Sequence, residues 1–338
     1  MTETPLRPES LDLDILGEMY RDGAANLAGI DPRLNATRIA RRLRVGRARV
    51  AARLKAWSRS GFLLRYDVWI NPVLFGWQGA WVSIRVDHPQ VKPALLSHLG
   101  LIDGAVSGFE FLGEWVSLGL VTPDAESLER RLSLVRGLAG VREVEPPVLW
   151  RVREPRRDLT ALDIRIVRAL RERPTATLSE TARRAGISTR TMTRRYSALV
   201  EDWAVWFVPV FDFRAISYPV VSLGVTLRPE VGMEAVGRQI RTRFPLTLDF
   251  RTAIVGPELG SQAYVFFVIP PSAAHLEELE QFVGSIKGVL SVESNVMVRM
   301  HPFSAWFDRH LETLAPGRSG PAPSRPSLRK KAHGTRSI

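Results

Sequence analysis

The sequence contains no cysteine, which excludes disulfide bonds, thiolate metal sites and a cysteine nucleophile. It has no apolar run near the ~18 residues that a membrane span needs, and its polar N-terminus is unlike a signal peptide. The patterns GxSxG, HExxH, GxGxxG and the Walker loop do not occur. We therefore expect a cytoplasmic protein with no membrane partner, no catalytic residues, no metal and no cofactor. The six histidines have no metal-ligand spacing and are expected at the surface: His88, His98, His275, His301, His310 and His333.

Acidic residues are missing from one stretch, Asn35–Arg65, which holds ten Arg or Lys residues. Its apolar residues fall at helical spacing on either side of a short break, Ile39 and Leu43 before it, Val50 and Leu54 after it. Two short amphipathic helices joined by a tight turn, with the charge outward, predict a helix-turn-helix that faces a phosphate backbone. The formal net charge of +12 also favours a polyanionic partner. Double-stranded DNA is the partner that we expect.

The recognition helix is expected from Arg47 to Trp57, with Gly46 as its cap. Arg47 and Arg49 lie near the helix start, where an arginine side chain can form two hydrogen bonds to guanine. The arginines before this helix are expected to hold phosphates, which carry no sequence information. The predicted DNA-binding residues of this stretch are Arg38, Arg41, Arg42, Arg44, Arg47, Arg49, Arg53 and Lys55. The alternatives are a solvated basic face on an ordinary helix pair and a nonspecific architectural DNA-binding protein.

The chain contains two tandem copies of one unit, as three pairs of matching segments show. These pairs are Leu11–Leu16 with Leu162–Val167, Ala40–Arg42 with Ala182–Arg184, and Gly140–Val144 with Gly288–Val292. In the second copy Ser188 is a strong N-cap, and Glu201–Ala204 brings two acids that oppose a phosphate. The predicted DNA-binding residues here are Arg190, Thr191, Arg194 and Arg195. The alternative for the second copy is a structural unit or a partner surface.

After each helix-turn-helix the pattern becomes β-α-β-β-α-β, which predicts a ferredoxin-like antiparallel sheet with two helices on one face. In the first copy these elements are expected at 80–86, 89–99, 105–112, 115–121, 123–136 and 140–152. In the second copy they are expected at 220–227, 232–244, 249–254, 262–269 and 273–285. Two extended pieces within 62–70 would form a small wing. The predicted fold class is α+β, with two winged helix-turn-helix domains that alternate with two ferredoxin-like domains.

The domain boundaries follow from these patterns. We expect an N-terminal tail at 1–9, helix-turn-helix domains at 10–70 and 154–212, ferredoxin-like domains at 71–153 and 213–301, and a C-terminal segment at 302–338. The N-terminal tail is expected to be loose. A separate loop is expected at 21–34. The charged, proline-containing segment 151–158 is the expected linker. In the C-terminal segment, Phe303, Trp306, Phe307 and Leu311 predict one short amphipathic helix, followed by a basic disordered tail.

These features resemble the Lrp/AsnC type of transcription regulator. The resemblance lies in the Leu-Asp start of each first helix, the segment Leu54–Phe62, the turn Asn71–Gly76, and the final strands that begin at Gly140 and Gly288. It covers roughly residues 10 to 152 and 159 to 300. It implies a DNA-binding regulator that assembles through its ferredoxin-like domains, as a homo-oligomer or, in this tandem chain, as an intramolecular pseudo-dimer. We expect the two sheets to pair and the operator to be asymmetric.

The same resemblance implies a small-molecule effector, such as an amino acid, between paired sheets. The matching positions are Gly113, Glu114, Trp115 and Gly256. The alternative is a plain hairpin turn with a packed tryptophan. Siroheme decarboxylases resemble the same two-domain unit, but the segments 106–111 and 248–252 lack the histidine that distinguishes them. An enzyme is therefore not expected.

Overall fold

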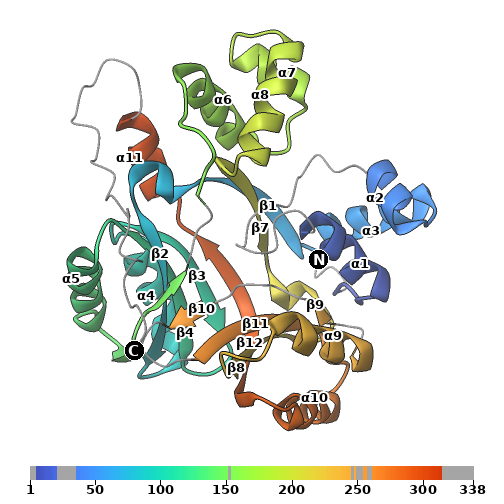
Figure 1. Cartoon of the computed structure of the whole chain (residues 1–338), viewed down its shortest axis with the longest axis vertical. Coiled ribbons are helices and arrows are strands. Elements are labelled where there is room, and N and C mark those ends of the chain that lie inside the picture. The colour runs from blue at the N-terminus through green and yellow to red at the C-terminus, as the bar shows by residue number, and fades with distance from the viewer. Residues whose placement is uncertain are drawn as a thin grey trace, which may run out of the picture.

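The structure is a computed structural model that describes residues 5–20, 36–150, 154–244, 247–248, 254–256 and 261–313. Two helix-turn-helices are formed by α1 (Ser10–Tyr20), α2 (Ala36–Leu43) and α3 (Arg47–Arg59), and by α6 (Ala161–Glu172), α7 (Leu178–Arg184) and α8 (Thr189–Glu201). The other helices are α4 (Lys92–Leu99), α5 (Ala125–Arg136), α9 (Met233–Arg243), α10 (Ala273–Ser285) and α11 (Ala305–Thr313). The predicted α+β class is confirmed (Figure 1).

The strands form one large sheet and one two-stranded ribbon. The first copy contributes β1 (Leu63–Ile70), β2 (Gln78–Val86), β3 (Ala105–Phe111), β4 (Trp115–Thr122), β5 (Val141–Val144) and β6 (Val148–Trp150). The second contributes β7 (Val205–Phe211), β8 (Val220–Leu227), β9 (Thr247–Leu248), β10 (Ile254–Gly256), β11 (Ser261–Val268) and β12 (Val289–Pro302). Short 3-10 turns are η2 (Pro72–Phe75), η3 (Pro89–Val91) and η4 (Phe213–Ala215).

Both copies contain the predicted ferredoxin-like unit. The strand order is β6-β2-β4-β3 in the first copy and β12-β8-β11-β9 in the second, so each unit places its fourth strand beside its first. The predicted last strand of the first copy is divided into β5 and β6. Pro146 and Pro147 lie between them, and proline cannot donate a ladder hydrogen bond. Of the predicted strand 249–254, residues 249–253 lie outside the described residues.

The two units pair within one chain, as expected. Strand β3 of the first unit pairs with β12 of the second, from Phe111↔Met297 to Ser107↔Pro302. Strand β10 of the second unit pairs with β6 of the first, and also with β11 of its own unit. The second strand of each unit thus meets the fourth strand of the other, which gives the sheet a twofold-like arrangement and closes it on itself. We call the β3–β12 junction the seam.

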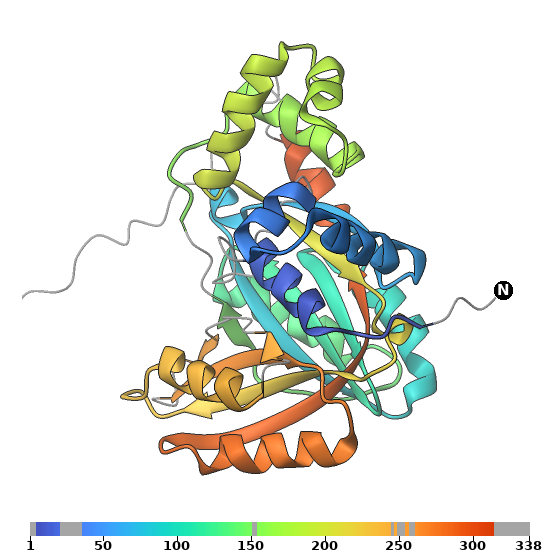
Figure 2. The same ribbon diagram turned by 90° about the vertical axis from the view of Figure 1, so that its right-hand side faces the viewer.

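Alternating burial in the strands positions two separate cores. In β2, Ala80, Val82 and Ile84 are buried against α4 and α5, while Trp81 points to the opposite, inner face. The second unit buries its apolar residues in the same way beneath α9 and α10. Figure 2 shows α10 running along the outer side of the second unit. The inner faces of both units are left to pack against the helix-turn-helices.

The wing of the first copy is one strand instead of the two extended pieces that were predicted. The segment 63–70 is a single strand, β1, which pairs antiparallel with β7 of the other copy, for example Trp69↔Trp206. Both strands are too apolar to face water on two sides, and every residue of β7 is buried. The ribbon crosses between the two helix-turn-helices (Figure 1), so each copy supports the other.

The N-terminal segment 5–9 is ordered by contacts, which corrects the prediction of a loose tail. Leu6 is buried and forms a parallel bridge with Ile216 of the second copy. Its backbone N–H donates to the Ala215 carbonyl at 2.7 Å, and its carbonyl accepts from the Ser217 N–H at 2.8 Å. Residues 1–4 and the predicted loop 21–34 lie outside the described residues.

The predicted C-terminal helix is confirmed as α11. Trp306, Phe307 and Leu311 are buried, and the Phe307 ring lies 5.4 Å from the ring of Trp69 in β1. His310 is half-buried and its ring stacks on Trp306 at 4.2 Å. The prediction of surface histidines is therefore wrong for His310, as it is for the half-buried His275 and His301. The predicted disordered tail after residue 313 and His333 lie outside the described residues.

Candidate nucleic-acid interface

The first helix-turn-helix is built as the sequence predicted. Ile39 of α2 and Val50 and Trp57 of α3 are buried against α1. Gly46 is the N-cap of α3, in an extended conformation with no side chain to cap the helix. The first N–H groups of α3 are therefore not covered by a cap side chain, and the start of the helix is open to an anion.

Basic side chains surround this helix start. Arg47 and Arg49 lie in the first turn of α3 and are exposed, and Ala48 between them is small and exposed. A small residue at this position lets a helix approach a groove closely. The other exposed predicted contacts are Arg38, Arg41, Arg44 and Lys55. Arg49 is 64% exposed, although its guanidinium lies 3.9 Å from the Glu9 carboxylate.

Arg53, a predicted DNA contact, lies against carboxylates in the structure and not on the open face of α3. Its side chain is 15% exposed, and its Nε donates to Asp12 Oδ1 at 2.8 Å. It also donates to the Glu9 carboxylate at 3.0 Å and to the Arg7 carbonyl at 2.9 Å. The hydrogen bond to Asp12 raises the pKa of Arg53. The buried Asp12 carboxylate needs a cation beside it, and Arg53 supplies that cation instead of facing outward.

Asp12 does more than cap α1. Its Oδ2 accepts from the Glu9 N–H at 2.8 Å, a capping contact at the start of the helix. Its Oδ1 also accepts from Trp57 Nε1 at 2.7 Å, and Asp12 is only 2% exposed. This one carboxylate therefore joins the N-terminal segment, α1 and α3.

Arg42 is also partly withdrawn from the surface. Its side chain is 26% exposed and lies 3.5 Å from the buried carboxylate of Glu18 in α1. A phosphate would have to compete with that carboxylate. Arg41, on the exposed side of α2, is better placed for the predicted backbone contact.

The second helix-turn-helix has stronger caps, and its recognition helix has fewer exposed cations than α3. Ser188 caps α8 by accepting from the Thr191 N–H at 3.2 Å, as predicted. Arg190 and Arg194 are exposed, but Thr191 is half-buried, and its hydroxyl accepts from the Ser188 hydroxyl at 3.0 Å. Arg195, also a predicted DNA contact, is half-buried and lies 3.5 Å from the buried Asp163 carboxylate.

The predicted effector turn is a hairpin closed by ion pairs. Gly113 takes a left-handed conformation at φ 82°, and Glu114 lies 2.9 Å from Arg85 and 3.9 Å from Arg142. The Arg85 guanidinium lies 5.9 Å from the centre of the half-buried Trp115 ring. Gly256 is the last residue of β10 in the other copy.

The seam brings together charged groups that sequence reasoning missed. His301 Nε2 lies 3.4 Å from the Glu110 carboxylate, and burial lowers the pKa of His301. Lys92 of α4 is 2% exposed and donates to the Phe111 carbonyl, and burial lowers its pKa too. Within the described residues no group of acidic or histidine side chains could hold a metal ion. The pairing of β3 with β12 creates this cluster, and no local motif announces it.

Comparison with known proteins identifies the second helix-turn-helix. Residues 159–202 match the family described as winged helix-turn-helix DNA-binding. The match spans α6, α7 and α8, the second helix-turn-helix. No curated protein sequence matches the chain. Among the described residues, no helix is long and apolar enough to cross a membrane.

One solved structure shares the fold over most of the chain, and two others match about half of it. The siroheme decarboxylase NirDL is 18% identical with a TM-score of 0.51, and the match covers 90% of this chain and 97% of that chain. AsnC from E. coli is 16% identical with a TM-score of 0.29, over 46% of this chain and 99% of that one. A transcriptional regulator from Neisseria meningitidis, solved with L-Met, is 16% identical with a TM-score of 0.31, over 43% and 92%. The tandem fold predicted from the sequence is therefore confirmed, and it is shared with NirDL.

Proposed function

We propose that this chain is a sequence-specific DNA-binding transcription regulator without enzymatic activity. The observation that carries the proposal is the start of α3, where exposed Arg47 and Arg49 flank the exposed Ala48 beside a helix end with no capping side chain. The match of residues 159–202 to a DNA-binding family supports the same role for the second copy.

The exposed cations divide into two groups by position. Arg47 and Arg49 are at the helix start, where recognition helices contact base edges. Arg38 and Arg41 on α2, Arg44 in the turn and Lys55 further along α3 would contact phosphates and fix the register. In the second copy Arg190 would contact bases. The two readers are unequal, which supports an asymmetric operator.

The experiment begins with selection of bound duplexes from a random pool by the whole chain, followed by affinity measurements at two salt concentrations. Arg47→Ala should cost about 1–3 kcal/mol on the selected duplex, seen as lost preference at one base position. Arg41→Ala is the matched control, because it should weaken binding to every duplex equally and reduce the salt dependence. If Arg47→Ala also acted equally on every duplex, the protein would be a nonspecific architectural binder.

We also propose an amino acid-like effector at the turn formed by Gly113, Glu114 and Trp115, with Gly256 in the other copy. The cation Arg85 beside Glu114 would receive the effector carboxylate after the ion pair opens. Calorimetric titration with the twenty amino acids tests this, with Glu114→Gln as the variant. Binding that is unchanged by Glu114→Gln would place the effector elsewhere. Whether copies of the chain associate further is tested by sedimentation.

A second candidate is a siroheme decarboxylase-like enzyme. NirDL carries that activity, and it shares the fold of this chain. The segment 106–111 has no histidine, but His301 of β12 pairs with Gly108 in the sheet, so the seam does contain an imidazole. An absorption scan with added siroheme distinguishes the candidates, because a regulator gives no stoichiometric spectral shift. A shift abolished by His301→Ala would favour the enzyme.

A further inference from the structure

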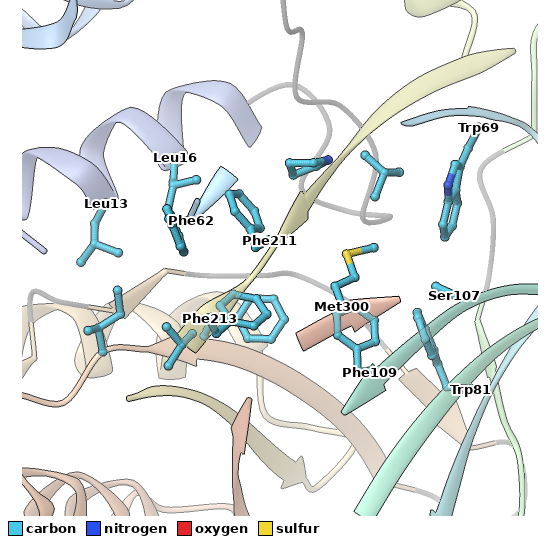
Figure 3. A pocket seen from close by; sticks show the side chains of 15 residues that line it. Leu13, Leu16, Phe62, Trp69, Trp81, Ser107, Phe109, Phe211, Phe213 and Met300 are labelled. Carbon is cyan, nitrogen blue, oxygen red and sulfur yellow. The ribbon is translucent and has the colours of Figure 1, made fainter. Parts of the chain in front are cut away.

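A cavity of about 60 Å³ lies where the first helix-turn-helix, the ribbon and the inner faces of both ferredoxin-like units meet. Figure 3 shows Leu13 and Leu16 of α1 at one end and Trp69 and Trp81 at the other, with Met300 of β12 between them. We call it the central cavity. Both copies contribute to its wall, so it exists only because the two units are joined.

The lining is apolar with one exception. Ser107 of β3 is fully buried, and its hydroxyl has no hydrogen-bond partner. A Cβ on Gly119 would lie 2.6 Å from this hydroxyl and 2.8 Å from the Trp81 ring, so the glycine leaves space for both groups. An unsatisfied buried hydroxyl costs free energy, and a water in the cavity would find few other polar partners. A ligand that is mostly apolar but has one hydrogen-bonding group would suit the apolar wall and also give the Ser107 hydroxyl a partner.

The size limits the ligand further. An apolar cavity of ~150 Å³ accepts benzene, so a space of about 60 Å³ accepts a molecule of a few heavy atoms. We propose that the central cavity binds a small neutral molecule with an apolar body and one hydrogen-bonding group, such as a short-chain ketone or alcohol. The polar group of the ligand would meet the Ser107 hydroxyl.

The position of the cavity links it to DNA binding. Leu13 and Leu16 belong to α1, whose Asp12 is bonded to Arg53 and Trp57 of the recognition helix. A ligand that pushes on α1 would therefore shift α3 relative to the sheet. This part of the inference rests on the proposed function, whereas ligand binding itself does not.

The test uses the whole chain labelled with ¹³C at its methionine methyl groups. Ethanol should shift the Met300 methyl signal saturably and leave that of Met192, which is buried in the second helix-turn-helix, unchanged. Ser107→Ala should weaken ethanol binding about tenfold, the factor that one hydrogen bond of ~1.4 kcal/mol supplies. Xenon, which cannot hydrogen-bond, should bind both proteins within about twofold, since its affinity depends on dispersion alone.

Two further measurements complete the test. Ser107→Ala should raise the melting temperature by about 2–4 °C, because it removes an unsatisfied buried group. Val220→Leu should fill part of the cavity and abolish the Met300 shift in a folded protein. No Met300 shift, equal shifts at Met192, or unchanged affinity in Ser107→Ala would overturn the site. Ethanol that binds but changes DNA affinity less than about fivefold would overturn the coupling.

Discussion

The two helix-turn-helices solve the same backbone problem with different residues. Arg44 and Gly186 occupy equivalent turn positions, 142 residues apart, and both are left-handed, at φ 57° and 65°. Gly61 and Trp203 are equivalent in the corner after the recognition helix, and both are again left-handed, at φ 74° and 60°. Each copy has glycine at one position and a strained side chain at the other. The fold fixes the backbone, and the residue type reflects what else the position does.

The two strained residues have different uses. Arg44 is exposed in the turn before α3, where a cation can reach a phosphate. Trp203 is half-buried, and its carbonyl accepts from Asn71 Nδ2 of the first copy at 2.8 Å. In the first copy the strained residue therefore carries a charge at the surface. In the second copy the strained residue makes a contact between the two copies.

The buried aspartates of the two copies, Asp12 and Asp163, also have different partners. Asp12 has a close hydrogen bond to Arg53 and another to Trp57. Asp163 forms a capping box with Thr160, but Arg195 and Arg157 lie 3.5 and 3.6 Å from it. Leu199 stands where Trp57 stands in the first copy, so no indole reaches Asp163. The first helix-turn-helix depends on one carboxylate far more than the second does.

Asp12→Ala should have the largest effect. It leaves Arg53 and the Trp57 N–H without their buried partner, and breaking such a pair costs about 3–5 kcal/mol. Asp163→Ala should cost about 1–2 kcal/mol, chiefly for the lost cap. Hydrogen exchange of α1–α3 and α6–α8 measures the two local unfolding free energies. Equal losses in both variants would show that the aspartates play the same part.

Much of the fold could be predicted from the sequence, because period-two and helical patterns directly reflect burial. The strand 220–227 and the helix 273–285 occur as expected. The pairing of β1 with β7 could not be predicted, since apolarity shows that a strand is buried but not what covers it. The central cavity was missed for the same reason.

The ion pair that buries Arg53 could have been predicted from the sequence. Asp12 corresponds to Asp163, and Arg53 corresponds to Arg195. A carboxylate and a guanidinium retained at equivalent positions of both copies indicate a structural pair. The charge pattern of Asn35–Arg65 alone does not reveal this pair, because its acidic member lies in α1, outside the stretch. The exposed cations Arg47 and Arg49 have no such pattern and stay predicted DNA contacts.

Arg44→Gly should have an intermediate effect that separates stability from binding. Relief of the left-handed strain, less the flexibility that glycine adds to the unfolded chain, should stabilise the protein by about 0.5–1 kcal/mol. Gly186→Ala, the matched change in the second copy, should destabilise it by about 1 kcal/mol. Thermal unfolding checks both signs. Arg44→Gly should also weaken binding to all duplexes, and unchanged DNA affinity would remove Arg44 from the proposed interface.

Acid should produce the smallest effect, and of the two helix-turn-helices it should loosen the second. His310 of α11 stacks on Trp306, its Nδ1 lies 2.9 Å from the Trp306 carbonyl, and burial lowers its pKa, with Asp103, Arg309 and Arg131 nearby. The unfolded chain therefore binds the proton more readily, so stability is full above the ordinary pKa of about 6.5 and falls as the pH drops below it.

The expected loss between pH 7.5 and 5.5 is under about 1 kcal/mol. It should appear as faster hydrogen exchange in α6–α8, after correction for intrinsic rates, and His310→Gln should abolish the change. His88→Gln, at an exposed position, is the control. The contacts of Leu6, Arg7 and Arg53 that support the first helix-turn-helix involve no histidine. An equal change in α1–α3 would mean that α11 supports both copies.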